Sequence, residues 1–229
     1  MAAEAPRPLR YPRCLPAGDQ AKLVELGDTI APELNLQVRR LCAAVQRAAI
    51  AGVLDLHPAY ASVLVRFDSQ RLRRQALLER LGQALAQLDA VELPPPRRIE
   101  LPVCYGGQAG PDLQDVAAHS GLAPAAVIEL HAAATYLVYF LGFAPGFAYL
   151  GGLPATLHTP RLPTPRPRVP AGSVGIAGGQ TGVYPLAIPG GWRLVGQTSQ
   201  VLFDPQRTPS ALLQPGDEVR FLPAGERAR

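Results

Sequence analysis

The stretch GSVGIAGGQTGVYPLAIPGGWRLVGQT, residues 172–198, is the most informative part of the chain about the fold of its second half. Its apolar pieces are short, and glycine or proline, which mark tight turns, separate them. The same pattern continues in VLFD at 201–204 and in GDEVRFL at 216–222. Many short strands with closely spaced turns predict an all-β barrel or sandwich.

Upstream of this stretch the pattern is mixed. A strand is predicted at Ile99–Cys104, followed by a glycine-containing loop and two short helices at Asp112–Ser120 and Pro124–Ala134. The apolar run Thr135–Leu141 is typical of a buried strand. Residues 94–229 therefore form, by prediction, one mostly-β domain.

The first 93 residues predict a small α+β unit. A helix is predicted to start near Pro32, because proline lacks a backbone N–H and this costs little in the first turn. Apolar residues then recur at helical spacing at Leu34, Val38, Leu41, Val45 and Ala49. A second helix has Asp68 or Ser69 as its expected N-cap, with Leu77, Leu81, Leu85 and Leu88 on one face. Strands are predicted at Ser62–Phe67 and near Leu9–Cys14 and Ala21–Leu26.

Three consecutive prolines, Pro94–Pro96, separate the two regions. They continue neither a helix nor a sheet interior and favour an extended spacer. We therefore predict two domains, a small α+β domain at residues 1–93 and a mostly-β domain at residues 94–229.

The charge distribution excludes several classes of partner. The net charge is +4, but it is spread evenly, with 12 basic and 10 acidic residues in 1–93 and 10 and 8 in 94–229. Neither half has the basic cluster that nucleic acid or a membrane surface requires. The longest uncharged stretch has an apolar part of only residues 130–141, far short of the roughly 20 residues of a spanning helix.

Other sequence features point to a cytoplasmic protein without a nucleotide-binding P-loop. The N-terminus lacks the apolar region of a signal peptide, and the three cysteines lie far apart, as expected of reduced thiols. Lys22 is the only lysine, and no G-x-x-x-x-G-K-[ST] motif occurs. The four histidines are isolated from one another, so no metal site is predicted.

Proline and glycine concentrate in residues 142–191. This segment holds 9 of the 25 prolines, 11 of the 22 glycines and no acidic residue, together with Arg161, Arg166 and Arg168. Rigid backbone and unneutralised arginines suit an anionic ligand. The alternative, equally weighted, is a set of barrel turns whose arginines face water.

Two further features leave alternatives open. His131 lies on the apolar face of a short predicted helix, where a core histidine is more common than a catalyst. Tyr184 and Trp192 flank the pair Gly190–Gly191 and form either an exposed aromatic platform or a cap on the barrel.

Four motifs in this region carry a resemblance. They are GFAPGFAYLGGLP (142–154), PRLPTPR (160–166), VPAGSVGIAGGQTGVYP (169–185) and PGGW (189–192). Together with PAYASVLVRFD (58–68), they resemble the KipI family, also called the allophanate hydrolase subunit 1 family. Two positions depart from the family pattern, Gln197 where arginine is usual and Ile188 where serine is usual.

The resemblance implies a cyclophilin-like β-barrel for the second domain and a role in a multi-subunit complex. The enzyme of this family is a 5-oxoprolinase, so the implied reaction is the ATP-dependent opening of 5-oxo-L-proline to L-glutamate. The implied partners are a homologous barrel protein of the KipA type, which is the C subunit of that enzyme, and the 5-oxoprolinase A subunit. ATP, with Mg, would be bound in that complex.

On the same resemblance, a set of side chains is expected to line the shared site or the subunit interface: His131, Arg161, Arg166, Gln180, Thr181, Tyr184 and Trp192. Among these, His131 is the candidate general base. The structural positions of the motifs are expected to be Gly142, Pro145, Gly146, Gly151, Gly152, Gly172, Gly190 and Gly191.

Two other functions remain as alternatives. One is a regulatory protein that binds and inhibits a sensor histidine kinase, as another member of the family does. The other is a detached subunit of urea or allophanate metabolism, since the same domain occurs within urea carboxylases.

Overall fold

The computed structural model describes residues 10–225 of the chain. The chain divides into two compact units, Met1–Pro94 and Pro95–Arg229. The run Pro94–Pro96 lies at this division.

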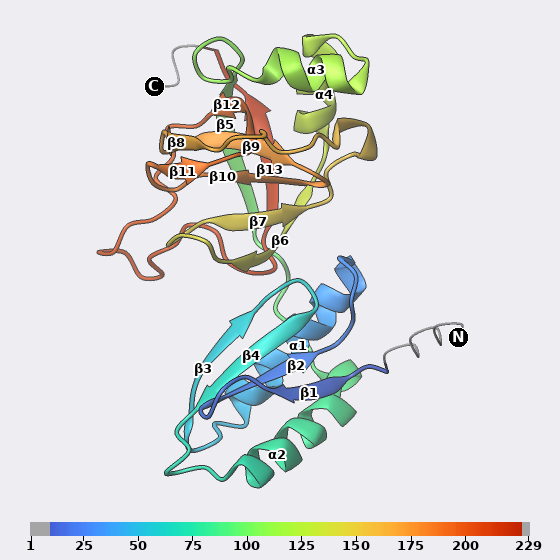
Figure 1. The fold of residues 1–229 in the computed structure, drawn as a ribbon, viewed down its shortest axis with the longest axis vertical. Coiled ribbons are helices and arrows are strands. Elements are labelled where there is room, and N and C mark those ends of the chain that lie inside the picture. Colours follow the sequence, from blue (N-terminus) through green and yellow to red (C-terminus); the bar gives the residue numbers. More distant parts are fainter. Residues whose placement is uncertain (1–9, 226–229) are drawn as a thin grey trace, which may run out of the picture. The chain divides into compact units, whose positions relative to one another are not determined.

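The first unit is a four-stranded antiparallel sheet with two helices on one face (Figure 1). The strands lie in the order β1-β2-β4-β3, and the helices pack their apolar sides against them. Its elements are β1 (Arg13–Pro16), β2 (Ala21–Glu25), α1 (Pro32–Arg47), β3 (Val53–Pro58), β4 (Ser62–Phe67), α2 (Arg74–Ala86) and a 3-10 turn (Leu88–Ala90).

Helix α1 begins at Pro32 as predicted, and Val38, Leu41 and Val45 are buried against the sheet. The predicted continuation to Ala49 is wrong. The helix ends at Arg47, and Ala49 has a positive φ of 43° in the turn that follows.

Helix α2 begins later than predicted, because Asp68 forms a turn of its own. Its carboxylate accepts the Gln70 N–H at 2.9 Å, and its carbonyl accepts the Leu72 N–H at 2.9 Å. Asp68 and Ser69 are therefore not the N-cap, which is Arg73.

The first strand is also shifted from its prediction. It runs over Arg13–Pro16, and Leu9, where it was expected to start, lies outside the described residues.

The second unit contains a closed seven-stranded barrel in the order β10-β7-β6-β13-β5-β12-β9 (Figure 1). All neighbouring pairs are antiparallel except β13 and β5, which are parallel. Its elements are β5 (Arg98–Tyr105), α3 (Leu113–Ser120), α4 (Pro124–Ala133), β6 (Tyr136–Leu141), β7 (Ala148–Gly151), a 3-10 turn (Ala155–Leu157), β8 (Arg166–Val169), β9 (Ser173–Ala177), β10 (Gln180–Val183), β11 (Ile188–Gly190), β12 (Arg193–Gln197) and β13 (Glu218–Pro223).

The closed sheet resolves the choice between barrel and sandwich. Helix α3 packs against β12 and α4 against β13, while β8 and β11 form a separate two-stranded ribbon. Apolar side chains from the barrel strands and both helices fill one core. The closed barrel confirms the predicted barrel alternative, while the order of the two domain classes and the cyclophilin-like type stay predictions.

Candidate functional site

The family-like motifs form an aromatic cluster on the outer wall of the barrel. Ala148 and Leu150 of β7 belong to the barrel core, and Tyr149 between them points to the opposite face. There Phe147 contacts Tyr184 and Trp192 edge to face, with ring centroids 5.3 Å and 5.5 Å apart. This aromatic cluster, Phe147, Tyr149, Tyr184 and Trp192, is the scaffold that the motifs build.

The cluster decides between the two alternatives for Tyr184 and Trp192. Tyr184 is 1% exposed and Trp192 is 5% exposed, so neither offers a surface on which a ligand stacks. The exposed-platform alternative is wrong, and both rings cap the barrel wall.

Arg166 is not a free cation. Its guanidinium donates two hydrogen bonds, of 2.9 Å and 2.7 Å, to the buried carboxylate of Asp112, which also accepts the Leu194 N–H at 2.7 Å. Arg193 is also paired, by a single hydrogen bond of 2.6 Å to the exposed carboxylate of Asp115. The carboxylates come from the start of α3, outside the segment 142–191, so Arg166 is neutralised within the chain, and its place at an anion site or subunit interface stays a prediction.

Replacing Arg166 by alanine is expected to lower the free energy of unfolding by about 2 kcal/mol, because the buried Asp112 carboxylate loses its charged partner. Urea unfolding followed by the fluorescence of Trp192, the only tryptophan, measures this. Arg168→Ala is the matched control, since Arg168 is exposed two residues away. Equal stabilities of the two variants would contradict the structural role.

Arg161 and Arg168 remain as uncompensated charges. Both are exposed, and no carboxylate within residues 10–225 forms an ion pair with either. Burial raises the pKa values of Tyr149 and Tyr184, and the nearby positive charge of Arg161 opposes that rise. Arg161 therefore borders the aromatic cluster.

His131 is enclosed in the barrel core, where both ring nitrogens are occupied. Nδ1 lies 2.7 Å from the Tyr105 hydroxyl, and Nε2 lies 3.0 Å from Thr181 Oγ1. Because the Thr181 hydroxyl donates to the Gly175 carbonyl, it accepts from Nε2–H, and Nδ1 accepts from Tyr105. The ring also stacks on Phe221, with centroids 4.7 Å apart.

This environment favours the core-histidine alternative. His131 is 0% exposed, and burial lowers its pKa from 6.5 to about 3, so the ring is neutral at physiological pH. Thr181 is likewise 0% exposed and serves the same network. Neither side chain reaches the surface, whereas Gln180 is half-buried at the start of β10.

The predicted structural positions lie at turns and close approaches. Gly172 has φ +80°, and a Cβ there would lie 2.0 Å from the Thr198 carbonyl oxygen. A Cβ at Gly190 would lie 2.3 Å from the Tyr184 hydroxyl. The remaining positions lie in or beside β7 or follow β11: Gly142, Pro145, Gly146, Gly151, Gly152 and Gly191.

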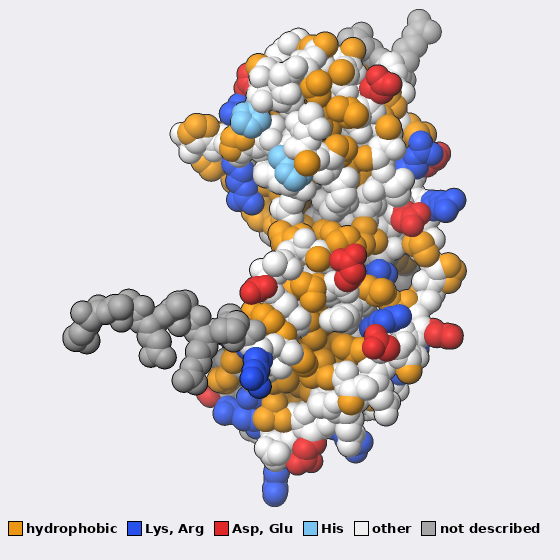
Figure 2. Space-filling model, turned by 90° about the vertical axis from the view of Figure 1, so that its right-hand side faces the viewer, with side chains coloured by type: hydrophobic (Ala, Val, Ile, Leu, Met, Phe, Trp, Pro, Cys, Tyr) orange, Lys and Arg blue, Asp and Glu red, His pale blue; other side chains and the backbone are white. Residues whose placement is uncertain are grey.

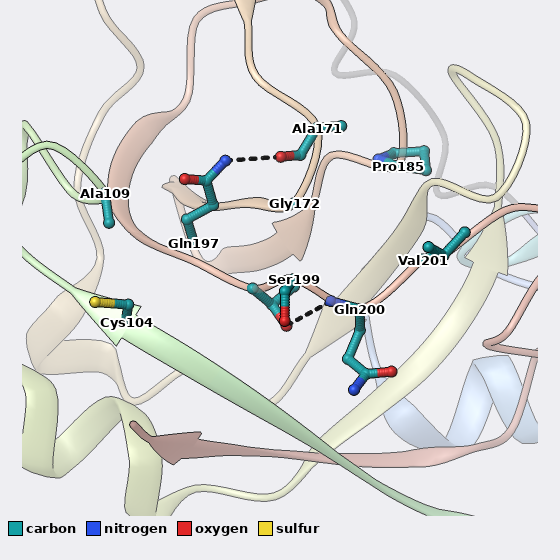
Figure 3. Close-up of a pocket in the computed structure, with 10 residues that line it drawn as sticks. Cys104, Ala109, Ala171, Gly172, Pro185, Gln197, Ser199, Gln200 and Val201 are labelled. Carbon is teal, nitrogen blue, oxygen red and sulfur yellow. Dashed lines mark hydrogen bonds between the residues drawn. The ribbon is translucent and has the colours of Figure 1, made fainter. Parts of the chain in front are cut away.

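Gly172 and Thr198, which approach each other closely, both line a pocket of about 420 Å³. Figure 3 shows the pocket with Gly172 labelled. Gln197, at the end of β12, donates from its amide nitrogen to the Ala171 carbonyl at 2.9 Å. The Gln200 N–H donates to Thr198 Oγ1 at 3.2 Å. The lining residues are Cys104, Ala109, Ala171, Gly172, Pro185, Gln197, Thr198, Ser199, Gln200 and Val201.

The pocket is uncharged, since none of its lining residues is acidic, basic or histidine, and it combines apolar side chains with the polar run 197–200. Its side-chain amides and hydroxyls provide both hydrogen-bond donors and acceptors. It therefore suits a neutral polar group such as an amide and does not suit a multiply charged phosphate chain.

Sequence reasoning missed most of this pocket. It marked Gln197 only as a departure from the family pattern. The signal that could have found it is the uncharged polar run QTSQ at 197–200, which begins at the last residue of a glycine-containing strand.

Figure 2 shows acidic and basic side chains interspersed with hydrophobic ones on the face in view. Within residues 10–225, no three His, Cys, Asp or Glu side chains gather in a metal-binding group. In the same range, every helix is too short or too polar to cross a membrane.

The chain matches the family model of the carboxyltransferase domain, subdomain C and D, over residues 12–213, and it belongs to that family. The B subunit of 5-oxoprolinase from Escherichia coli O157:H7 is 47% identical over 214 residues, which are 93% of this chain and 97% of the relative. The protein of the same name from Bacillus subtilis (strain 168) is 41% identical over 92% of each chain. The resemblance found in the motifs is confirmed.

Solved structures agree on the fold. The crystal structure of TTHA0988 superposes with a TM-score of 0.80 at 41% identity, over 92% of this chain and 41% of that one. This chain thus spans about two fifths of that longer protein. The Kluyveromyces lactis urea amidolyase shares the fold, with a TM-score of 0.75 at 23% identity over 93% of this chain and 15% of its own.

Proposed function

We propose that this chain is one subunit of an ATP-dependent 5-oxoprolinase, which opens the lactam of 5-oxo-L-proline to give L-glutamate. One observation carries the proposal: the 5-oxoprolinase B subunit of Escherichia coli O157:H7 matches this chain at 47% identity over nearly the full length of both. A shared fold alone would not support this proposal, because one fold hosts many unrelated functions.

The pocket supplies the chemistry for recognising the substrate. A lactam presents one N–H donor and one carbonyl acceptor side by side. The amides of Gln197 and Gln200 and the hydroxyl of Ser199 line the pocket with the complementary groups. We assign these side chains to binding and orienting the amide ring.

The lining of this pocket does not fit ATP. A triphosphate needs several cations, and no arginine or lysine lines the pocket. Arg166, the arginine expected to bind phosphate, is neutralised by Asp112. We therefore propose that ATP and its Mg are held by the partner proteins and assign no phosphate contact to this chain.

The proposed partners are a homologous barrel protein of the KipA type, the C subunit of the enzyme, and the 5-oxoprolinase A subunit. The proposed location is the cytoplasm, where the three cysteines stay reduced. The chain alone is expected to be inactive.

The test is reconstitution. The chain and its two proposed partners are purified separately, and 5-oxoproline-dependent ATP hydrolysis is measured for each protein alone and for the mixture. Turnover that requires all three components supports the proposal. A mixture that hydrolyses ATP no faster when 5-oxoproline is added would refute it.

A large side chain placed in the pocket tests whether the substrate binds there. Ser199→Trp is expected to raise the KM for 5-oxoproline by about tenfold or more while the complex still assembles, because the indole occupies space that the ring needs. Gln206→Trp is the matched control, since Gln206 is exposed in a turn outside the pocket. An unchanged KM in the Ser199 variant would place the substrate elsewhere.

A further inference from the structure

Phe143 is held in an unusual position. It is 64% exposed, and its backbone has φ +67°, in the left-handed region that bulky side chains rarely occupy. Its ring contacts Phe147 edge to face, with centroids 5.5 Å apart. The Phe143 ring is thus exposed to solvent on a backbone in a disfavoured conformation, although it lies beside a buried cluster.

The loop that carries Phe143 is firmly built. Gly142 donates its N–H to the Phe147 carbonyl at 3.0 Å, and Phe147 donates to the Ala144 carbonyl at 3.0 Å. Phe147 itself is 1% exposed and anchors the loop in the aromatic cluster. The exposed ring is therefore pre-organised, a property that lowers the entropic cost of binding.

The same cluster is bordered by positive charge. Arg161 lies near Tyr149 and Tyr184, and Arg168 is on the β8 strand whose Val169 packs into the cluster. Both arginines are exposed and have no carboxylate partner among residues 10–225, whereas neighbouring Arg166 and Arg193 are paired. Phe143 and Arg161 thus border the aromatic cluster, and Arg168 lies on the strand next to it; we call these three residues together the motif face.

We propose that the motif face docks a partner protein whose surface offers an apolar recess for Phe143 surrounded by carboxylates for Arg161 and Arg168. Aromatic and arginine side chains are the residues that most often carry binding energy at protein interfaces. Charge complementarity selects an acidic partner, and two copies of this face would repel each other in a symmetric dimer.

The test uses the homologous barrel protein as the partner, and this choice of partner is the only part of the inference that rests on the proposed function. The binding affinity of that purified protein is measured by calorimetry for the wild-type chain and for variants. Phe143→Gly is expected to weaken binding by about 30-fold or more. Arg161→Glu is expected to weaken it by about tenfold, with a smaller dependence on salt.

Phe143→Gly separates docking from folding. Glycine adopts the left-handed conformation without strain, so the variant is expected to be at least as stable as the wild type in urea unfolding. A merely structural Phe143 would give the opposite pattern, with stability lost and affinity kept. The controls are Ile30→Ala and Arg73→Glu, an exposed apolar and an exposed basic residue of the first unit.

The outcomes are distinct. The inference is overturned if Phe143→Gly binds the partner with wild-type affinity. It is also overturned if the wild-type chain self-associates and Phe143→Gly abolishes that association, because a second copy would then be the occupant. Weakened binding in Phe143→Gly with both controls unchanged supports it. If the wild-type complex assembles through this face but shows no turnover with 5-oxoproline, the proposed function fails and the docking inference stands.

Discussion

Gly172→Ala is expected to destabilise the second unit by more than about 3 kcal/mol, because two costs coincide at this position. The backbone is left-handed, with φ +80°, which an alanine adopts only at a cost of about 1–2 kcal/mol. A Cβ would also lie 2.0 Å from the Thr198 carbonyl oxygen. Relieving that overlap moves the wall of the pocket and breaks the bond from the Thr198 N–H to the Gly172 carbonyl.

The chain provides a matched control for this prediction. Gly178 also has a positive φ, of 56°, but a Cβ there would meet nothing within 4 Å. Gly178→Ala therefore incurs only the backbone cost, about 1 kcal/mol. Urea unfolding followed by Trp192 fluorescence compares the two. Equal losses of stability would show that the approach of Gly172 to Thr198 is dispensable.

The second large effect is a dependence of stability on pH that His131 causes. Its pKa is about 3 in the folded chain, because of burial, and about 6.5 when unfolded. Between these values the unfolded state binds a proton that the folded state does not, so stability falls as pH falls. The slope from this single group approaches 1.4 kcal/mol per pH unit between about pH 6 and pH 4.

The measurement is the free energy of unfolding at several pH values for the wild type and for two variants. His131→Gln is expected to be less stable at neutral pH, by about 2 kcal/mol, because the network from Tyr105 to Thr181 is broken. As the pH is lowered, the stability of this variant is also expected to fall less steeply than that of the wild type. His119→Gln, at an exposed position on α3, should keep the wild-type slope. Parallel curves for the wild type and the His131 variant would contradict this account.

Local signals predicted much of the fold. The spacing of Val38, Leu41 and Val45 predicted α1, because a helix needs only an apolar stripe and a permissive start at Pro32. Strand β3 was missed because a bulge between Val53 and Asp55 interrupts the alternation of apolar and polar residues. The start of α2 was misplaced because Asp68 caps a separate turn.

The candidate site was harder to predict, because it depends on contacts between residues that are far apart in the sequence. Arg166 seemed unneutralised in a segment without acidic residues, yet its partner Asp112 is 54 positions away along the chain. The pocket brings together Cys104, Ala171 and Gln197 from three separate segments. Phe143 gave no signal, since neither its exposure nor its left-handed backbone is visible in the letters GFAPGF.

The parallel pairing of β5 with β13 has a consequence for synthesis. β5 is the first strand of the barrel to leave the ribosome and β13 is the last, and β13 also pairs with β6. Until Glu218–Pro223 emerge, the nascent barrel therefore exposes two unpaired strand edges, on β5 and on β6. Open edges of this kind recruit other chains. The pairing of β13 with both β5 and β6 closes these edges in one step, so the incomplete barrel is the species most exposed to association with other chains.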